Sequence, residues 1–155
     1  MNFSKNTLNQ IKFVLDTITD IADQLKEEDL KFRPTENKHS VGELFEHLAM
    51  ICLADLRIAQ GFSKEEMDTF YSGRSYKTIP EIKASIAENY QILKEAYLGF
   101  SEKELNEQIT SYWGVTYSRF EWLLEILAHL CHHRGQLHAI LVHCLHKDPG
   151  IPLFE

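Results

Sequence analysis

The chain has 155 residues, of which 44% are hydrophobic and 25% are charged. This length and balance are typical of one folded domain, so we expect a single domain over residues 1–155 with no long disordered tract. The formal net charge of −7 gives the chain no electrostatic reason to approach phosphate backbones or anionic lipids, which argues against nucleic acid and membranes as partners.

The first residues, MNFSKNTLNQ, lack the apolar run of a signal peptide, and no apolar stretch approaches the roughly 20 residues that span a bilayer. We therefore expect a cytoplasmic location. The three cysteines, Cys52, Cys131 and Cys144, lie among helix-forming apolar residues and form no CxxC pair. This pattern predicts reduced, buried thiols and argues against a zinc ribbon or a redox site.

The first part of the chain predicts two long helices separated by a turn. From Ser4 to Gln24, apolar residues recur at steps of three and four, which is the period of one helix face. Pro34 and a polar cluster follow, so the chain should turn there. Ser40 and Glu43 have the spacing of a capping box, which predicts a second helix that begins at Ser40 and ends near residue 61.

The middle of the chain predicts a short helix, a long helix and an extended segment. Ser63 can cap a short helix ahead of the loop YSGRSYK. Thr78 and Glu81 repeat the capping-box spacing and open a third long helix that should end at Gly99. A minor helical segment from Ser101 then leads into ITSYWGVTY, whose β-branched and aromatic residues indicate an extended loop or a short hairpin.

The last helix should begin at Ser118, which forms a capping box with Glu121, and run to about His146. Tyr117 and Trp122 occupy the positions of a hydrophobic staple across its start. Four long helical patterns without convincing strands predict an all-α four-helix bundle. The connection between the second and third helices is long enough to cross the bundle, so those two helices could run parallel.

Histidines supply the candidate site, because five of the eight lie in the string HLCHHRGQLHAILVH of the last helix. His129 and His133 are four residues apart, so their imidazoles lie on one face and can converge on one ion. His132 is rotated by about 100° and should be exposed. His47 lies beside the apolar stripe of the second helix and can face inward. Two helices then offer three imidazoles to a shared space.

The alternative is that each inward histidine is a core residue with one hydrogen bond. Four other histidines are expected to lie outside the site: His39, His138, His143 and His146. Leu130, Cys131 and His132 separate the pair, so the glutamate of an HExxH metalloprotease is missing. Three neutral histidines would leave a coordination position for water or substrate, and they suit zinc, nickel, copper or iron.

Two charged residues, Asp55 and Arg134, project near the middle of apolar stripes, where an unpaired charge is costly. We expect each to form a structural ion pair or to extend its charged end to solvent. Asp55 is two turns beyond His47, so it is not expected to pair with Arg134. Glu43 is the carboxylate that we expect first as the partner of Arg134.

The stretches FRPTENKHSVGELFEHLA and HLCHHRGQLHAIL resemble the DinB family and its YfiT-like branch, and the HRGQ motif at residues 133–136 carries much of the resemblance. The resemblance implies a bundle of up-down-down-up order, a homodimer, and a metal held by His47, His129 and His133. It also implies a similarity to thiol-dependent S-transferases and isomerases that use low-molecular-weight thiols. In the motif, Gly135 could instead allow close helix packing, and Gln136 could complete a hydrogen-bond network.

Two functional hypotheses follow from the residues and the resemblance. In the first, one divalent ion, zinc by preference and nickel as the second choice, activates a thiol or water, so that the protein is an S-transferase or hydrolase acting on a small molecule. No protein side chain is assigned a catalytic role. In the second, the same ion stabilises a non-catalytic, stress-related bundle.

Overall fold

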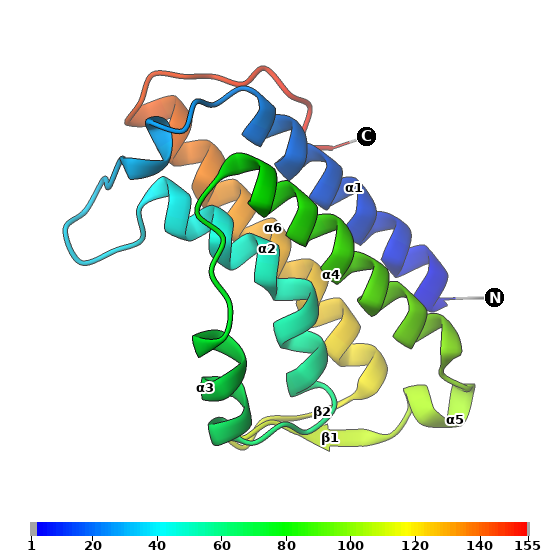
Figure 1. Cartoon of the computed structure of the whole chain (residues 1–155). Coiled ribbons are helices and arrows are strands. Elements are labelled where there is room, and N and C mark those ends of the chain that lie inside the picture. The colour runs from blue at the N-terminus through cyan, green and yellow to red at the C-terminus, as the bar shows by residue number, and fades with distance from the viewer. Residues whose placement is uncertain (1–2, 155) are drawn as a thin grey trace.

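The computed structural model describes residues 3–154, and most of this chain is helical, as the sequence predicts. Figure 1 shows the elements in chain order. They are α1 (Phe3–Asp23), the short 3-10 helix η1 (Asp29–Lys31), α2 (Val41–Ile58), α3 (Lys64–Ser72), α4 (Ile79–Gly99), α5 (Glu102–Leu105), β1 (Gln108–Thr110), β2 (Thr116–Ser118) and α6 (Arg119–His143).

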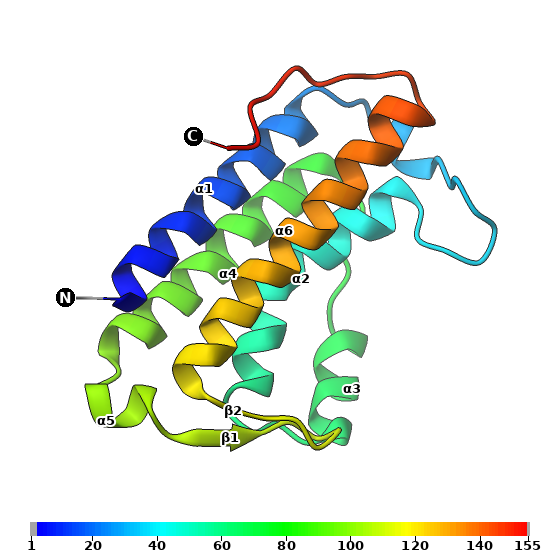
Figure 2. The ribbon, with the colours of Figure 1, turned by 180° about the vertical axis from the view of Figure 1, so that it is seen from behind.

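Four long helices, α1, α2, α4 and α6, form the body of the molecule. Helix α2 packs against α4 and α6, and α1 packs against the same two helices. Figures 1 and 2 show α3, α5 and the β1–β2 hairpin gathered at one end of these helices, while the segment after α6 crosses the other end toward α1. The two ends of the body therefore carry different structures.

The helix starts follow the capping signals of the sequence. The four predicted capping boxes are all formed, with Ser40, Ser63, Thr78 and Ser118 as their N-caps, and Ser101 caps α5 in the same way. Helix α6 ends at His143, three residues earlier than predicted. His146 adopts a φ of 52°, in the left-handed region, so the chain turns away just beyond the helix.

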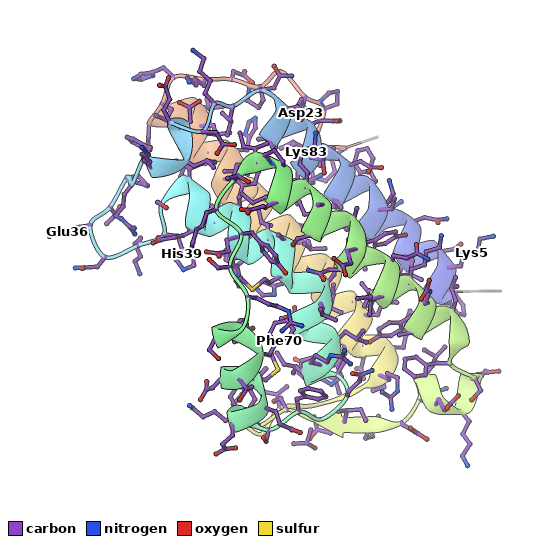
Figure 3. All side chains as sticks on the ribbon, viewed as in Figure 1. Lys5, Asp23, Glu36, His39, Phe70 and Lys83 are labelled. Atoms are coloured by element: carbon purple, nitrogen blue, oxygen red, sulfur yellow. The ribbon has the colours of Figure 1, made fainter. Side chains whose placement is uncertain are left out.

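Apolar side chains from all four long helices form one core, with polar links between the helices. Inside the core, Asn89 donates a hydrogen bond to the carbonyl of Ala49 at 2.8 Å and so connects α4 to α2. At the surface, Asp23 of α1 and Lys83 of α4 form an ion pair, and Figure 3 shows them at neighbouring helix ends. Within the described residues, no helix is long and apolar enough to span a membrane.

The predictions for Arg134 and the cysteines need correction. Arg134 is buried, but its Nη1 donates to the hydroxyl of Thr17 at 2.9 Å. Glu43 pairs instead with Arg33 at 2.8 Å, because its position in the first turn of α2 faces the preceding loop. This ion pair holds the pKa of Glu43 at about 2. The expected Arg134–Glu43 pair is therefore wrong.

The three cysteines differ in burial, although all are free thiols. Cys52 is buried in the core, Cys131 is half-buried, and Cys144 is exposed. The prediction of buried thiols is confirmed for Cys52, holds only in part for Cys131, and is wrong for Cys144, which follows the last residue of α6.

Two helical glycines give a matched test of the packing. A Cβ added to Gly42 would lie 3.0 Å from the backbone oxygen of Leu30, whereas one added to Gly135 would meet no atom within 4 Å. The close-packing explanation for Gly135 is thus not supported. We expect Gly135→Ala to raise the free energy of unfolding by about 0.5–1 kcal/mol through helix propensity. Gly42→Ala should lower it by about 1 kcal/mol through overpacking.

Denaturant unfolding of the two alanine variants beside the parent measures both effects. Equal stabilisation by the two substitutions would show that Leu30 and the start of α2 can move apart to accept the added Cβ without a loss in the free energy of unfolding.

Candidate metal centre

Three histidines meet between α2 and α6. The Nε2 atoms of His47 and His129 lie 3.2 Å apart. The ring centroid of His47 lies 4.6 Å from that of His133, and the rings of His129 and His133 are 4.9 Å apart. One ligand atom from each of the three imidazoles lies within 4.8 Å of the others, so this group could hold a metal ion. The structure thus brings together the residues that the sequence singled out.

Helix geometry and core packing account for this meeting. His129 and His133 are on successive turns of α6, which places their side chains on one face. Leu48 of α2 and Leu130 of α6 are fully buried beside the histidines. Because α2 and α6 pack together through these apolar stripes, their register brings His47 opposite the α6 pair.

Two hydrogen bonds orient the imidazoles. Nδ1 of His129 lies 2.8 Å from the Asp55 carboxylate, and Nδ1 of His133 lies 2.9 Å from the side-chain oxygen of Gln136. Both acceptors favour the tautomer with a proton on Nδ1, so the Nε2 lone pairs stay available for a metal. The predicted hydrogen-bonding role of Gln136 is confirmed.

Asp55 is the site residue that sequence reasoning missed. Its side chain is mostly buried and pairs with His129. The sequence predicted a structural ion pair or a solvent-directed side chain for Asp55 but did not identify this partner. The signal was present, because an acidic residue on an apolar stripe two turns from an inward histidine needs a partner. The pattern of a single helix could not identify that partner on α6.

The protonation of the histidines fits metal binding. Burial, together with the neighbouring imidazoles, lowers the pKa of His47 to about 4, and burial also lowers the pKa of His133. The hydrogen bond that Nδ1 of His129 donates to the Asp55 carboxylate raises the pKa of His129. At neutral pH His47 and His133 are therefore in the neutral form that binds metals, and protons compete with a metal most strongly at His129.

The other histidines lie outside the triad. His132, His143 and His146 are exposed, as the sequence predicts. His138 faces Asp148 at 4.0 Å near the end of the chain. His39 is exposed in the loop before α2, where Figure 3 labels it, and its ring centroid lies 5.9 Å from that of His47.

A cleft of about 490 Å³ opens beside His129. Its walls come from α2, α3, the β1–β2 hairpin and α6, and it is lined by Asp55, Ile58, Tyr71, Tyr112, Trp113, Trp122, Glu125, Ala128, His129 and His132. A more open hollow of about 600 Å³ lies between α3 and the end of α2, and its lining contains no histidine. Of these two hollows, only the cleft beside His129 is lined by a residue of the triad.

The fold and the site define this protein as a helical protein with a three-histidine group between two of its long helices. The family model of the DinB superfamily matches residues 10–137, and the chain belongs to that superfamily. A structure of a protein from Exiguobacterium sibiricum 255-15, assigned to the DinB family, is 30% identical, covers 99% of both chains and has a TM-score of 0.87.

Two further structures share the fold at lower identity. A DinB-like protein from Bacillus cereus ATCC 10987 is 17% identical with a TM-score of 0.75, and the match covers 96% of this chain and 97% of the other. A DinB-like protein from Bacillus subtilis is 15% identical with a TM-score of 0.70, and the match covers 95% of each chain. No curated protein matches the chain significantly.

The Asp55–His129 hydrogen bond should contribute to the affinity of the site for zinc. Asp55→Asn keeps the size of the side chain but removes the charge that orients and polarises His129. We expect zinc affinity at neutral pH to fall by about 10- to 100-fold, as for other residues that hold a ligand in place. Competition with a chromophoric chelator measures this change. Asp16→Asn, at an exposed carboxylate of α1 paired with Lys12, is the control and should leave affinity unchanged.

Proposed function

We propose that this DinB superfamily member is a metal-dependent enzyme that transfers a low-molecular-weight thiol to a small electrophile. In the proposal, His47, His129 and His133 are the metal ligands, zinc is the preferred ion and nickel the second choice. Hydrolysis of a small molecule at the same site is the related chemistry that we retain. The proposal also keeps the up-down-down-up helix order, a homodimer and a cytoplasmic location as expectations.

The observation that carries the proposal is the cleft beside the triad. His129 is in the lining of this cleft, and its imidazole contacts that of His47. A volume of about 490 Å³ falls within the range of small-molecule sites. An ion with only structural importance would need no such opening, because structural sites are closed by four protein ligands. The opening therefore favours catalysis over the non-catalytic, stress-related bundle.

The donor set fits thiol chemistry. Three neutral imidazoles leave the positive charge of a divalent ion uncompensated, and an ion held by them supplies a Lewis acid that lowers the pKa of a thiol or water. The chain contributes orientation, since Asp55 and Gln136 hold two of the rings by their Nδ1 atoms. The segment between His129 and His133 has no glutamate to act as a protease base, so thiol transfer is better supported than peptide hydrolysis.

The ligand assignment is tested by metal uptake. We expect His133→Ala to abolish stoichiometric zinc binding, and His47→Ala and His129→Ala to do the same. His132→Ala is the matched control, because it removes the neighbouring imidazole, which is exposed. Metal analysis after gel filtration gives the stoichiometry, and the melting temperature with added zinc gives an independent readout, since only the folded chain assembles the ligands. Full occupancy in all three triad variants would disprove the assignment.

The reaction is tested with monochlorobimane and three thiols, namely cysteine, glutathione and coenzyme A. In the reaction, a sulfur–carbon bond forms, the carbon–chlorine bond breaks, chloride leaves and the thiol proton passes to solvent. We expect the zinc- or nickel-loaded protein to accelerate at least one of these conjugations, and His129→Ala to lose the acceleration. His143→Ala, at the exposed end of α6, should keep it. Equal rates for parent and His129→Ala with every thiol and both metals would favour the non-catalytic alternative.

A further inference from the structure

The cleft beside His129 has aromatic walls. Four of its lining side chains are aromatic: Tyr71 from α3, Tyr112 and Trp113 from the hairpin, and Trp122 from α6. Tyr71, Tyr112 and Trp113 are between 40% and 51% exposed, so part of each ring is accessible to a ligand. Aromatic rings from three separate elements thus face one hollow.

The hairpin holds two of these rings in place. Ser111 and Val115 close the turn with backbone hydrogen bonding at 2.8 Å, and Gly114 has a φ of 95°, which favours glycine. Trp122 is buried and donates its indole N–H to the carbonyl of Ile109 at 3.1 Å, so α6 anchors the hairpin. The rings of Trp113 and Trp122 meet edge-on with centroids 6.1 Å apart. The aromatic wall is therefore built before any ligand arrives.

Two carboxylates line the cleft. Asp55 and Glu125 are both in its lining, and the described residues that line it include no lysine or arginine. Asp55 is engaged by His129, but among the described residues no cation forms an ion pair with the exposed Glu125. Glu125 lies one turn before His129 on α6, next to Trp122 in the lining. The end of the cleft near the hairpin thus combines an available carboxylate with aromatic rings.

We propose that this cleft recognises an organic cation, a small molecule with an ammonium group that sits among Trp113, Trp122 and Glu125. Aromatic faces attract a cation placed within about 6 Å of a ring centroid, most strongly for tryptophan, and a nearby carboxylate adds to this attraction. In the metal-free protein, an anionic ligand would meet Asp55 and Glu125 with no lysine or arginine in the described lining to compensate their charge. A neutral ligand would gain only from the apolar surface.

This inference rests on the proposed function in one respect, namely that the remainder of the cation would extend along α6 toward His129 and there meet the metal site. The ammonium group would then decide which small molecules are substrates. Recognition of the cation itself needs no metal, so it can be tested separately from the reaction.

Tryptophan fluorescence reports directly on the cleft, because the two tryptophans of the chain, Trp113 and Trp122, both line it. Metal-free protein is titrated with benzyltrimethylammonium, with its uncharged carbon isostere neopentylbenzene, and with phenylacetate as an anion. We expect saturable fluorescence change with the cation, and an affinity at least about fivefold higher than for the neutral isostere. Phenylacetate should bind more weakly than either.

Variants locate the binding. Calorimetry measures the affinity of each variant for the two probes. Glu125→Gln and Trp113→Leu should each lower the affinity for benzyltrimethylammonium by about threefold or more and leave the affinity for neopentylbenzene little changed. Glu88→Gln, the same chemical change at an exposed position of α4, should have no effect on either probe. Equal affinity for the cation and the isostere, no saturable binding of the cation, or an unchanged cation affinity in Glu125→Gln and Trp113→Leu would overturn the proposal. Full zinc occupancy in the triad variants would count against the proposed function alone and leave recognition of the cation untouched.

Discussion

The register between α2 and α6 is the constraint on which the candidate site depends. Leucines beside the histidines are completely buried where these two helices pack, so a slip of one helix against the other would expose apolar surface along the contact. The same packing brings Nε2 of His47 to 3.2 Å from Nε2 of His129. The core therefore positions the imidazoles, and no loop has to order before a metal could bind.

This arrangement has an electrostatic cost that the surrounding groups reduce. Three imidazoles in one half-buried space cannot all be protonated, which agrees with the lowered pKa values of His47 and His133. Asp55 acts in the opposite direction and raises the pKa of His129. The site thus combines two rings that readily stay neutral with one ring whose orientation is held by a carboxylate. A divalent ion would be bound by all three neutral imidazoles, whereas protonated rings at the same distances would repel one another.

The parts of the structure that local sequence signals determine were predictable. Capping boxes marked the starts of the long helices after the first, because their hydrogen bonds join residues three apart. The spacing of His129 and His133 is also a local signal: residues four apart lie on one face of a helix, so their shared face was predictable. Partners distant in sequence were not predictable: Asp55 pairs with His129 across α2 and α6, and Glu43 pairs with Arg33 rather than Arg134. The aromatic cleft needed α3, the hairpin and α6 together, so no single segment indicated it.

X-ray absorption of the zinc-loaded protein can show whether three histidines of α2 and α6 hold one metal ion. Coordination by His47, His129 and His133 predicts about three imidazole nitrogens at about 2.0–2.1 Å, with the remaining position taken by a light atom from solvent. The spectrum of His132→Ala should be the same. A sulfur neighbour at about 2.3 Å would implicate a cysteine such as Cys131 on α6, and a shell of oxygen without imidazole scattering would place the ion elsewhere. Either result would contradict coordination of the ion by His47, His129 and His133 alone.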